Sequence, residues 1–155
     1  MLYFAYGSNM DGDQMRGSCP RAELRHPSAR LDGYELDFRR RSQRWQAGAA
    51  DIVAREDASL FGCVWELAEE EVAALDAREG VGATPPAYRR LSVTVVAELE
   101  AVPVFTYAVV EKSPAAVAPA PEYARLMADS ARELGLPPEY QTQLRAKLQL
   151  LGISF

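Results

Sequence analysis

The sequence is poor in the residues that build most metal and nucleophile sites. Its 155 residues include one histidine, His26, and two cysteines, Cys19 and Cys63, which lie far apart. A histidine-rich metal centre is thereby excluded, and any Ser-His-Asp or Cys-His arrangement would have to use His26. The cysteine spacing matches no metal-binding pattern and favours reduced thiols in a reducing compartment. We therefore expect a cytoplasmic protein without a bound metal.

Long hydrophobic runs are absent as well. The longest apolar segment, Val102–Val110, has the length of a strand and contains Pro103 and Thr106, so it cannot span a bilayer. Met1 is followed directly by strand-like residues, without the basic start of a signal peptide. No P-loop and no G-x-G-x-x-G occurs, so nucleotide chemistry has no support. Neither a membrane partner nor a nucleotide cofactor is expected.

Basic residues are outnumbered by acidic ones, and the formal net charge is −5. This balance argues against a general polyanion binder. One basic cluster, Arg39–Arg41 with Arg44, could grip phosphates, but no basic helix or basic-aromatic pattern accompanies it. We interpret the cluster as a solvated strand end and loop, and expect no nucleic-acid partner. A polyanion-binding module built on these arginines remains an alternative.

The pattern of apolar residues predicts an α+β fold. With 48% hydrophobic and 25% charged residues, the chain has a globular composition, and its length suits a single domain over residues 1–155. Asp11–Ala29 shows no sustained period and is expected to be a loop with one short helix at most. Period-two and apolar runs predict strands at the opening stretch and at 34–39, 49–54, 60–67, 88–96 and 102–110.

Helical periodicity begins at Ala68 and ends at Gly80, and returns in two helices near the C-terminus, after an Ala/Pro linker at 113–121. Pro103 suggests an edge position or a bulge in its strand. Because strands come first and helices are mostly last, we expect a mainly antiparallel sheet, curled into a small barrel, with flanking helices. No internal repeat is visible.

The opening stretch Tyr3–Met10 joins a short apolar strand to a polar turn, Gly7-Ser8-Asn9. Gly7 permits backbone angles that let successive N–H groups point into one concavity, where they could bind a carboxylate or an oxyanion. The alternative is an ordinary strand followed by a Gly-Ser-Asn turn.

Glu79 is the acidic residue with the most informative position. Val72 and Leu75 mark the buried face of the helix from Ala68, and Glu79 falls on the same stripe. It also lies at the negative end of the helix dipole, which disfavours its ionised form. Burial and the dipole would together raise its pKa toward the range of a general acid/base. A frayed, exposed helix end is the alternative. Asp76 flanks the stripe as a supporting or solvated group.

Two tyrosines follow Gly/Pro-rich segments. Tyr88 and Tyr123 could supply hydroxyl groups to a pocket, although a tyrosine at the start of a strand or helix commonly belongs to the core or its rim.

Several blocks in this order resemble the gamma-glutamylcyclotransferase family. They span nearly the whole chain, and the combination of Y-G-S-N with a later E-G-V is more specific than either alone. The blocks are Tyr6-Gly7-Ser8-Asn9-Met10, Ser42-Gln43-Arg44-Trp45, Leu75–Val81, Pro119–Tyr123 and Gly135–Gln141.

The resemblance implies a small mixed barrel and a cyclotransferase without metal or cofactor. The turn containing Tyr6, Gly7, Ser8, Asn9 and Met10 would bind the γ-glutamyl group. Glu79 corresponds to the catalytic acid/base of the family, and Tyr88 and Tyr123 are similar to residues that line its pocket. A homodimer is compatible with the resemblance. The chain departs from the family pattern at 82–86, where Pro85 and Pro86 precede Tyr88, and it ends at Phe155 without the tail of some relatives; these departures bear on substrate preference and dimer contacts.

The expected reaction is attack of a γ-glutamyl α-amine on its own γ-carbonyl, releasing 5-oxoproline and an amine or amino acid. The leaving group is open among amino acids, glutathione, amines and natural-product side chains. A protein that binds γ-glutamyl or amino-acid ligands without turnover is the alternative function, and turnover of γ-glutamyl-alanine separates the two.

Overall fold

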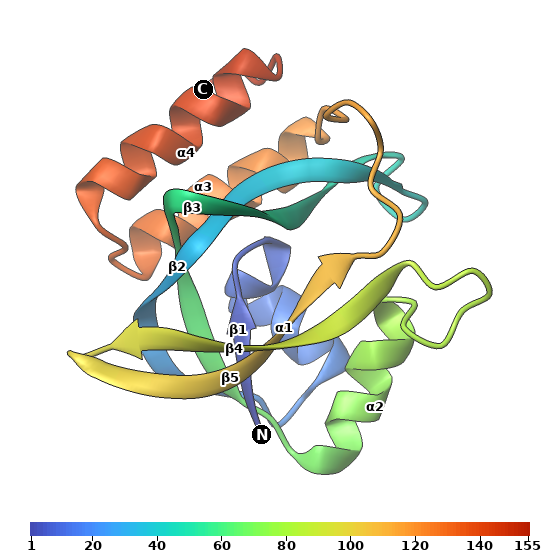
Figure 1. Ribbon diagram of the computed structural model, residues 1–155, viewed down its shortest axis with the longest axis vertical. Helices are drawn as coiled ribbons and strands as arrows, with labels where there is room; N and C mark the ends of the chain where they lie inside the picture. The colour runs from blue at the N-terminus through green and yellow to red at the C-terminus, as the bar shows by residue number, and fades with distance from the viewer.

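The structure, a computed structural model that describes all 155 residues, is built on a closed barrel of five strands. The strands follow one another around the barrel in the order β1-β3-β2-β4-β5, and only the contact between β1 and β5 is parallel (Figure 1). Their bounds are Leu2–Ala5 for β1, Glu23–Ser42 for β2, Ala47–Glu66 for β3, Tyr88–Ala97 for β4 and Glu100–Val109 for β5. The small, mainly antiparallel barrel expected from the sequence is confirmed.

The hairpin of β2 and β3 forms the longest part of the barrel wall, with two strands of 20 residues each. Register shifts at four places in β2 let the hairpin bend around the barrel, because bulges increase strand curvature. Two sequence expectations are wrong here. The segments 49–54 and 60–67 belong to one continuous strand, whose exposed middle, Arg55–Asp57, interrupts the apolar pattern without ending the strand. The sequence predicts a loop with one short helix at 11–29; the short helix is present at Gly12–Ser18, but from Glu23 onward the segment is the beginning of β2 and not a loop.

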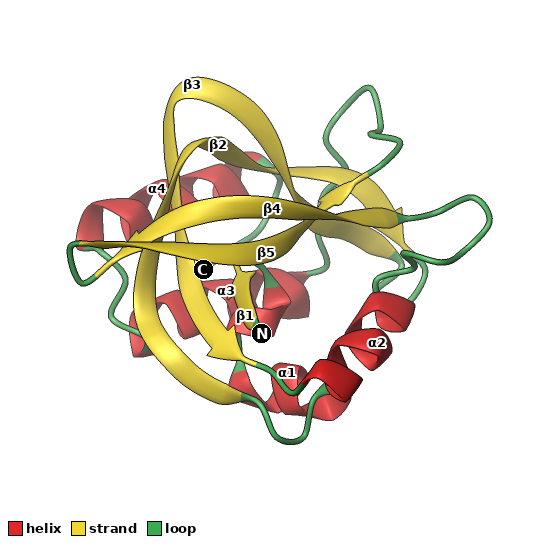
Figure 2. Cartoon of the chain, turned by 60° about the horizontal axis from the view of Figure 1, so that its bottom comes forward, coloured by secondary structure: helices red, strands yellow, loops and turns green.

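Helices flank the barrel on separate sides (Figure 2). A 3-10 turn, η1 (Ser8–Met10), and α1 (Gly12–Ser18) follow β1 directly. Helix α2 (Glu69–Arg78) connects β3 to β4, as the helical period from Ala68 to Gly80 predicts. Helices α3 (Pro121–Glu133) and α4 (Pro138–Leu150) pack side by side, away from α2 in both views. None of the helices is long and apolar enough to cross a membrane.

The barrel interior and the inner faces of the helices share one hydrophobic core. Phe4, Phe38, Ile52 and Leu60 from the strands are almost fully buried. Gly62 is required where β3 pairs with the end of β1, because a Cβ at this position would lie 2.1 Å from the carbonyl oxygen of Ala5. Burial of Phe4 and the close contact between Ala5 and Gly62 hold β1 in place, and β1 in turn positions the polar turn that follows it.

Strands β4 and β5 form a regular hairpin in which Pro103 lies opposite Thr94 without a bulge. Strand β5 pairs with β1 only at Tyr3 and Phe105, so Pro103 lies beyond the paired part of that edge. This is the edge position that a proline, which lacks a backbone N–H, can occupy in a sheet.

Candidate active site

A cavity of about 610 Å³ opens at the end of the barrel where β1, β2 and β5 finish and β3 and β4 begin. Its walls come from η1, the β2–β3 turn, the segment after α2 and the start of α3. The volume lies within the usual range for small-molecule sites, roughly 300–1,000 Å³. This end of the barrel is therefore the candidate active site.

Most residues singled out from the sequence line this one cavity, although they lie in distant parts of the chain. They are Tyr6, Gly7, Ser8, Asn9, Glu79, Tyr88 and Tyr123. Met10 does not line the cavity: its side chain is only 2% exposed and belongs to the hydrophobic core. The polar turn thus contributes three successive residues to the cavity, and its last residue anchors it to the core.

The end of α2 fixes the position of Glu79. The N–H of Gly80 donates to the carbonyl of Ala77 at 3.1 Å, and the N–H of Val81 donates to the carbonyl of Asp76 at 3.0 Å. With Gly80 at a φ of +70°, this is a Schellman motif, in which glycine is favoured after the helix cap. Glu79 is the cap itself, so its side chain leaves the helix at a position set by the motif.

Glu79 is half-buried, because it faces the cavity while protein surrounds it on the other sides. Burial raises the pKa of its carboxyl from 4.5 to about 7, and the hydrogen bond from Asn9 and the charge of Arg44 offset only part of this effect. The elevated pKa follows from scarce partners, since one amide at 3.4 Å is the single hydrogen-bond donor to Glu79. A carboxyl group with a pKa near 7 can both accept and donate a proton near neutral pH.

Asn9 connects the polar turn to Glu79. Its Nδ2 donates to Glu79 Oε1 at 3.4 Å and to the hydroxyl of Tyr3 at 3.2 Å. Its backbone carbonyl accepts from Trp65 Nε1 at 2.9 Å, which holds η1 against β3. The Oδ1 atom of Asn9 is buried and has no hydrogen-bond partner in the protein. Because buried polar atoms are rarely left unpaired, this acceptor is available to a donor on a bound ligand.

The amide groups of the turn are also available. Gly7 donates no backbone hydrogen bond, and the first bond of η1 is donated by Met10 to Gly7. The first N–H groups of a helical turn have no partner within it, which makes such a turn suited to an anion. Gly7 is needed for space, since a Cβ would lie 3.0 Å from the Ala50 side chain and 3.2 Å from the Tyr123 hydroxyl.

Tyr88 and Tyr123 are held by the same residue of β3. The hydroxyl of Tyr88 donates to the carbonyl of Ala50 at 2.9 Å, and the hydroxyl of Tyr123 accepts from the Ala50 N–H at 3.0 Å. Burial raises the pKa of both phenols, so both remain neutral. Trp45 packs edge-on against Tyr123, with ring centroids 5.1 Å apart. The two tyrosines therefore form rigid, uncharged walls.

Two further tyrosines that the sequence pattern does not single out, Tyr3 and Tyr107, line the cavity. Tyr3 accepts the hydrogen bond from Asn9, and Tyr107 donates to Asp76 Oδ1 at 2.6 Å. Asp76 also binds Arg90 at 2.9 Å, so it is a supporting group that is partly covered. Both tyrosines lie within apolar strand patterns, where a pocket residue cannot be told from a core residue.

Three arginines complete the wall, namely Arg40, Arg44 and Arg78. Arg44 belongs to the Ser42–Trp45 block, which forms the turn between β2 and β3. No group of three or more His, Cys, Asp or Glu side chains is arranged to hold a metal ion. The site thus combines one titrating carboxyl group, free backbone donors, neutral tyrosines and fixed positive charge.

Comparison with known proteins gives consistent results for sequence and structure. An AIG2-like family model matches residues 59–144. The chain is 32% identical to gamma-glutamylcyclotransferase from Mus musculus and 33% identical to that from Bos taurus, each alignment covering 94% of this chain and 77% of the relative. A solved structure of a gamma-glutamyl cyclotransferase superimposes with a TM-score of 0.87 at 30% identity, over 94% of this chain and 86% of that one.

Proposed function

Because the chain belongs to the gamma-glutamylcyclotransferase family, we propose that its cavity cyclises a γ-glutamyl compound to 5-oxoproline, with Glu79 moving the protons. The observation that carries this assignment is a half-buried carboxyl group with a pKa of about 7, next to a turn with free amide groups. The carboxyl group alone, or the turn alone, could serve many ligands. Together they match what an intramolecular aminolysis requires, a base and an anion site on one folded substrate.

In the first step, ionised Glu79 removes a proton from the substrate α-ammonium. The freed amine attacks the γ-carbonyl carbon of the same molecule, and a five-membered ring closes. The amides of Gly7, Ser8 and Asn9 bind the substrate α-carboxylate or the developing oxyanion, which backbone donors stabilise most effectively in a site shielded from water. The unpaired Oδ1 of Asn9 is suited to accept from the α-ammonium before it loses its proton.

In the second step, the tetrahedral intermediate collapses. The protonated Glu79 gives its proton to the leaving nitrogen, the original amide C–N bond breaks, and the oxyanion becomes the lactam carbonyl. Glu79 then takes the second proton from the ring nitrogen and passes it to the released nitrogen, so the products are 5-oxoproline and a free amine or amino acid in its ammonium form. Glu79 ends ionised, so one carboxyl group serves as base and then acid. A pKa near 7 suits both roles, since neither direction of transfer is strongly uphill.

The neutral tyrosines shape the substrate instead of reacting with it. Tyr88 and Tyr123 are fixed through Ala50, and Tyr6 is fixed by donating to the Tyr107 carbonyl at 2.6 Å. Rigid walls favour the folded conformer in which the α-amine lies near its own γ-carbonyl, and such positioning accounts for a large part of intramolecular rate acceleration.

The test is release of 5-oxoproline from γ-glutamyl-alanine by the wild-type protein and by Glu79→Gln. We expect turnover by the wild type and almost none by the variant, with unchanged circular dichroism. Binding of γ-glutamyl-alanine without any 5-oxoproline would instead identify a non-catalytic binding protein.

The proposal places the enzyme in the cytoplasm, with a small γ-glutamyl molecule as its partner and neither nucleic acid nor membrane. Both cysteines are buried and free, in keeping with a reducing compartment. A homodimer remains an expectation of the family resemblance.

A further inference from the structure

The cavity is positively charged in a protein that is negative as a whole. Its wall contains the three arginines Arg40, Arg44 and Arg78, against two acidic residues, Glu79 and Glu111. The entire chain has a net charge of −5. Opposite charge concentrated in a cleft attracts and orients a charged substrate. The cavity is therefore adapted to a ligand more negative than a neutral γ-glutamyl amide.

None of these three arginines has a carboxylate within salt-bridge distance. Arg39, next to Arg40 in β2, binds Asp37 at 2.7 Å and the Pro114 carbonyl at 3.1 Å. Glu111, the second acid in the wall, is exposed and forms no ion pair. The guanidinium groups in the cavity wall are thus not engaged in ion pairs with protein carboxylates.

The three arginines differ in how far they are already engaged. Arg78 donates to the Gln14 carbonyl at 3.0 Å, to Gln14 Oε1 at 3.1 Å and to Ser18, so it fastens α2 to α1. Arg44 makes one long contact with Gln14 Oε1, at 3.4 Å, and lies over the ring of Trp45. The backbone of Arg40 pairs with Ala49 of β3, but its side chain makes no hydrogen bond or ion pair with the protein. Arg40 and Arg44 are consequently the two available guanidinium groups.

Arg40 is also half-buried. A cation removed from water without a partner is unfavourable, so such a group commonly has its partner in a ligand. Its charge influences the phenol of Tyr88, while the charge of Arg44 influences the carboxyl of Glu79. Both guanidinium groups therefore act on the cavity interior.

We infer that the leaving group is an acidic amino acid, whose carboxylates are bound by Arg40 and Arg44 while the γ-glutamyl part occupies the turn at Gly7–Asn9. This inference rests on the proposed function, because it assigns the second half of the same substrate. An acidic amino acid has two carboxylates, and two unengaged guanidinium groups match them in charge and number. Guanidinium groups bind carboxylates with paired hydrogen bonds, which gives orientation as well as affinity.

The test compares two substrates that differ by a single charge, γ-glutamyl-glutamate and γ-glutamyl-glutamine. We expect kcat/KM for the glutamate compound to be about tenfold higher at low ionic strength, and the ratio to fall as salt is added. γ-Glutamyl-aspartate and γ-glutamyl-asparagine form a second pair of the same kind. Equal kcat/KM values for both members would overturn the inference while leaving cyclisation itself established.

Variants then assign the preference to residues. In Arg40→Gln and in Arg44→Gln we expect the glutamate-to-glutamine ratio to decrease toward one, and further in the double variant. Arg41→Gln is the matched control, since Arg41 is the exposed neighbour of Arg40 and lies outside the cavity wall. If Arg40→Gln fails to fold, Arg44→Gln, on an exposed turn, decides the question. A preference that survives both substitutions would contradict the assignment. Absence of 5-oxoproline from every compound would instead reject the proposed function.

Discussion

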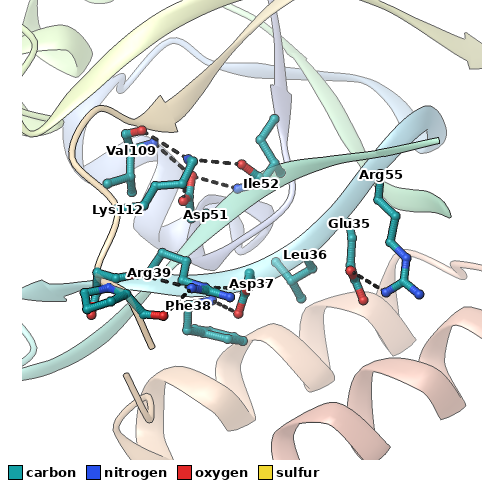
Figure 3. Close-up of polar contacts among 12 residues, drawn as sticks. Glu35, Leu36, Asp37, Phe38, Arg39, Asp51, Ile52, Arg55, Val109 and Lys112 are labelled. Atoms are coloured by element: carbon teal, nitrogen blue, oxygen red, sulfur yellow. Dashed lines mark hydrogen bonds and ion pairs between the residues drawn. The ribbon is translucent and has the colours of Figure 1, made fainter. Parts of the chain in front are cut away.

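Asp51 and Glu79 are both acidic side chains enclosed by this protein, and their surroundings differ in almost every respect. Asp51, in β3, is 0% exposed and is surrounded by donors (Figure 3). Its Oδ1 accepts from the N–H groups of Ile52 and Val109, each at 2.8 Å, and its Oδ2 accepts from Lys112 Nζ at 2.7 Å. Lys112 also donates to the Val109 carbonyl at 3.1 Å, so the cluster fastens the end of β5 to β3.

Glu79 has the opposite environment. One amide group at 3.4 Å is its hydrogen-bond donor, no lysine or arginine lies within salt-bridge distance, and its pKa is raised to about 7. The donors around Asp51 make it part of the fold, because removing a buried, paired carboxylate leaves its partners uncompensated. A carboxylate that is enclosed but poorly partnered can change its protonation state. The number of hydrogen-bond donors and cations around each carboxyl group therefore distinguishes the structural acid, Asp51, from the reactive acid, Glu79.

The largest effect is expected from removing the reactive acid. Glu79→Gln keeps the size of the side chain and one acceptor oxygen but can neither accept nor donate the transferred proton. We expect kcat for a γ-glutamyl dipeptide to fall by about 10³-fold or more, because one group supplies both base and acid. Release of 5-oxoproline measures it. Retention of a tenth of the activity would show that Glu79 is not the proton-transfer group.

Removing the structural acid should damage stability instead. Asp51→Ala leaves two buried N–H groups and one lysine without their acceptor, which costs about 3 kcal/mol in the free energy of unfolding. Urea denaturation measures the change. Asp51→Asn, which keeps one acceptor oxygen, is the matched control and should lose less. A loss below about 1 kcal/mol in the alanine variant would mean that the cluster contributes little to the fold.

Whereas replacing Asp51 should lower the free energy of unfolding, replacing Glu79 should raise it at high pH. Because its folded-state pKa lies above its unfolded value, Glu79 contributes stability that is fully present below about pH 4.5 and is lost as pH rises through about 7. Glu79→Gln should therefore stabilise the protein by about 1–2 kcal/mol near pH 8. Near about pH 4 the wild type and the variant should unfold alike. Equal stability at both pH values would show that the ionised Glu79 carries no penalty.

The smallest effect concerns the pH profile. We expect kcat/KM to rise with pH through an apparent pKa of about 7, as Glu79 becomes ionised. The charge of Arg44 lowers that pKa, so Arg44→Gln should move the midpoint to higher pH by a fraction of a unit. The substrate for this measurement should have a neutral leaving group, such as γ-glutamyl-alanine. A midpoint that stays in place, or moves to lower pH, would remove Arg44 from the surroundings of Glu79.

Much of the fold and one part of the site could be predicted from the sequence, because they depend on local periodicity. The helix before Glu79 and the glycine that ends it are encoded within a dozen residues, and both are present in the structure. The continuity of β3 could not be predicted in this way. A long bent strand keeps its pairing through an exposed polar middle, and only its partner β2 reveals that it continues.

The remaining parts of the site depend on contacts between distant residues. Asn9 reaches Glu79 across 70 positions of the chain, and Tyr107 reaches Asp76 across 31. The sequence neighbours of Arg40 predict a solvated cluster, yet Arg40 lies in the cavity wall while Arg41 is exposed. Arg40 and Arg41 are adjacent and look alike in the sequence, but their surroundings differ, and only the tertiary structure shows this difference.

The four-residue strand β1 also determines when the protein can become active during its synthesis. It is made first, but Phe4 accepts a hydrogen bond from Thr106, which lies 102 residues later. The turn that follows β1 is held by Trp65 of β3, but the cavity wall is complete only after Tyr107 of β5 and Tyr123 of α3 have been made. Such distant pairings slow folding, into the millisecond-to-second range of roughly 10⁻³ to 1 s. Nascent chains that stop before β5 should therefore be catalytically silent, however much of the β2–β3 hairpin they have already formed.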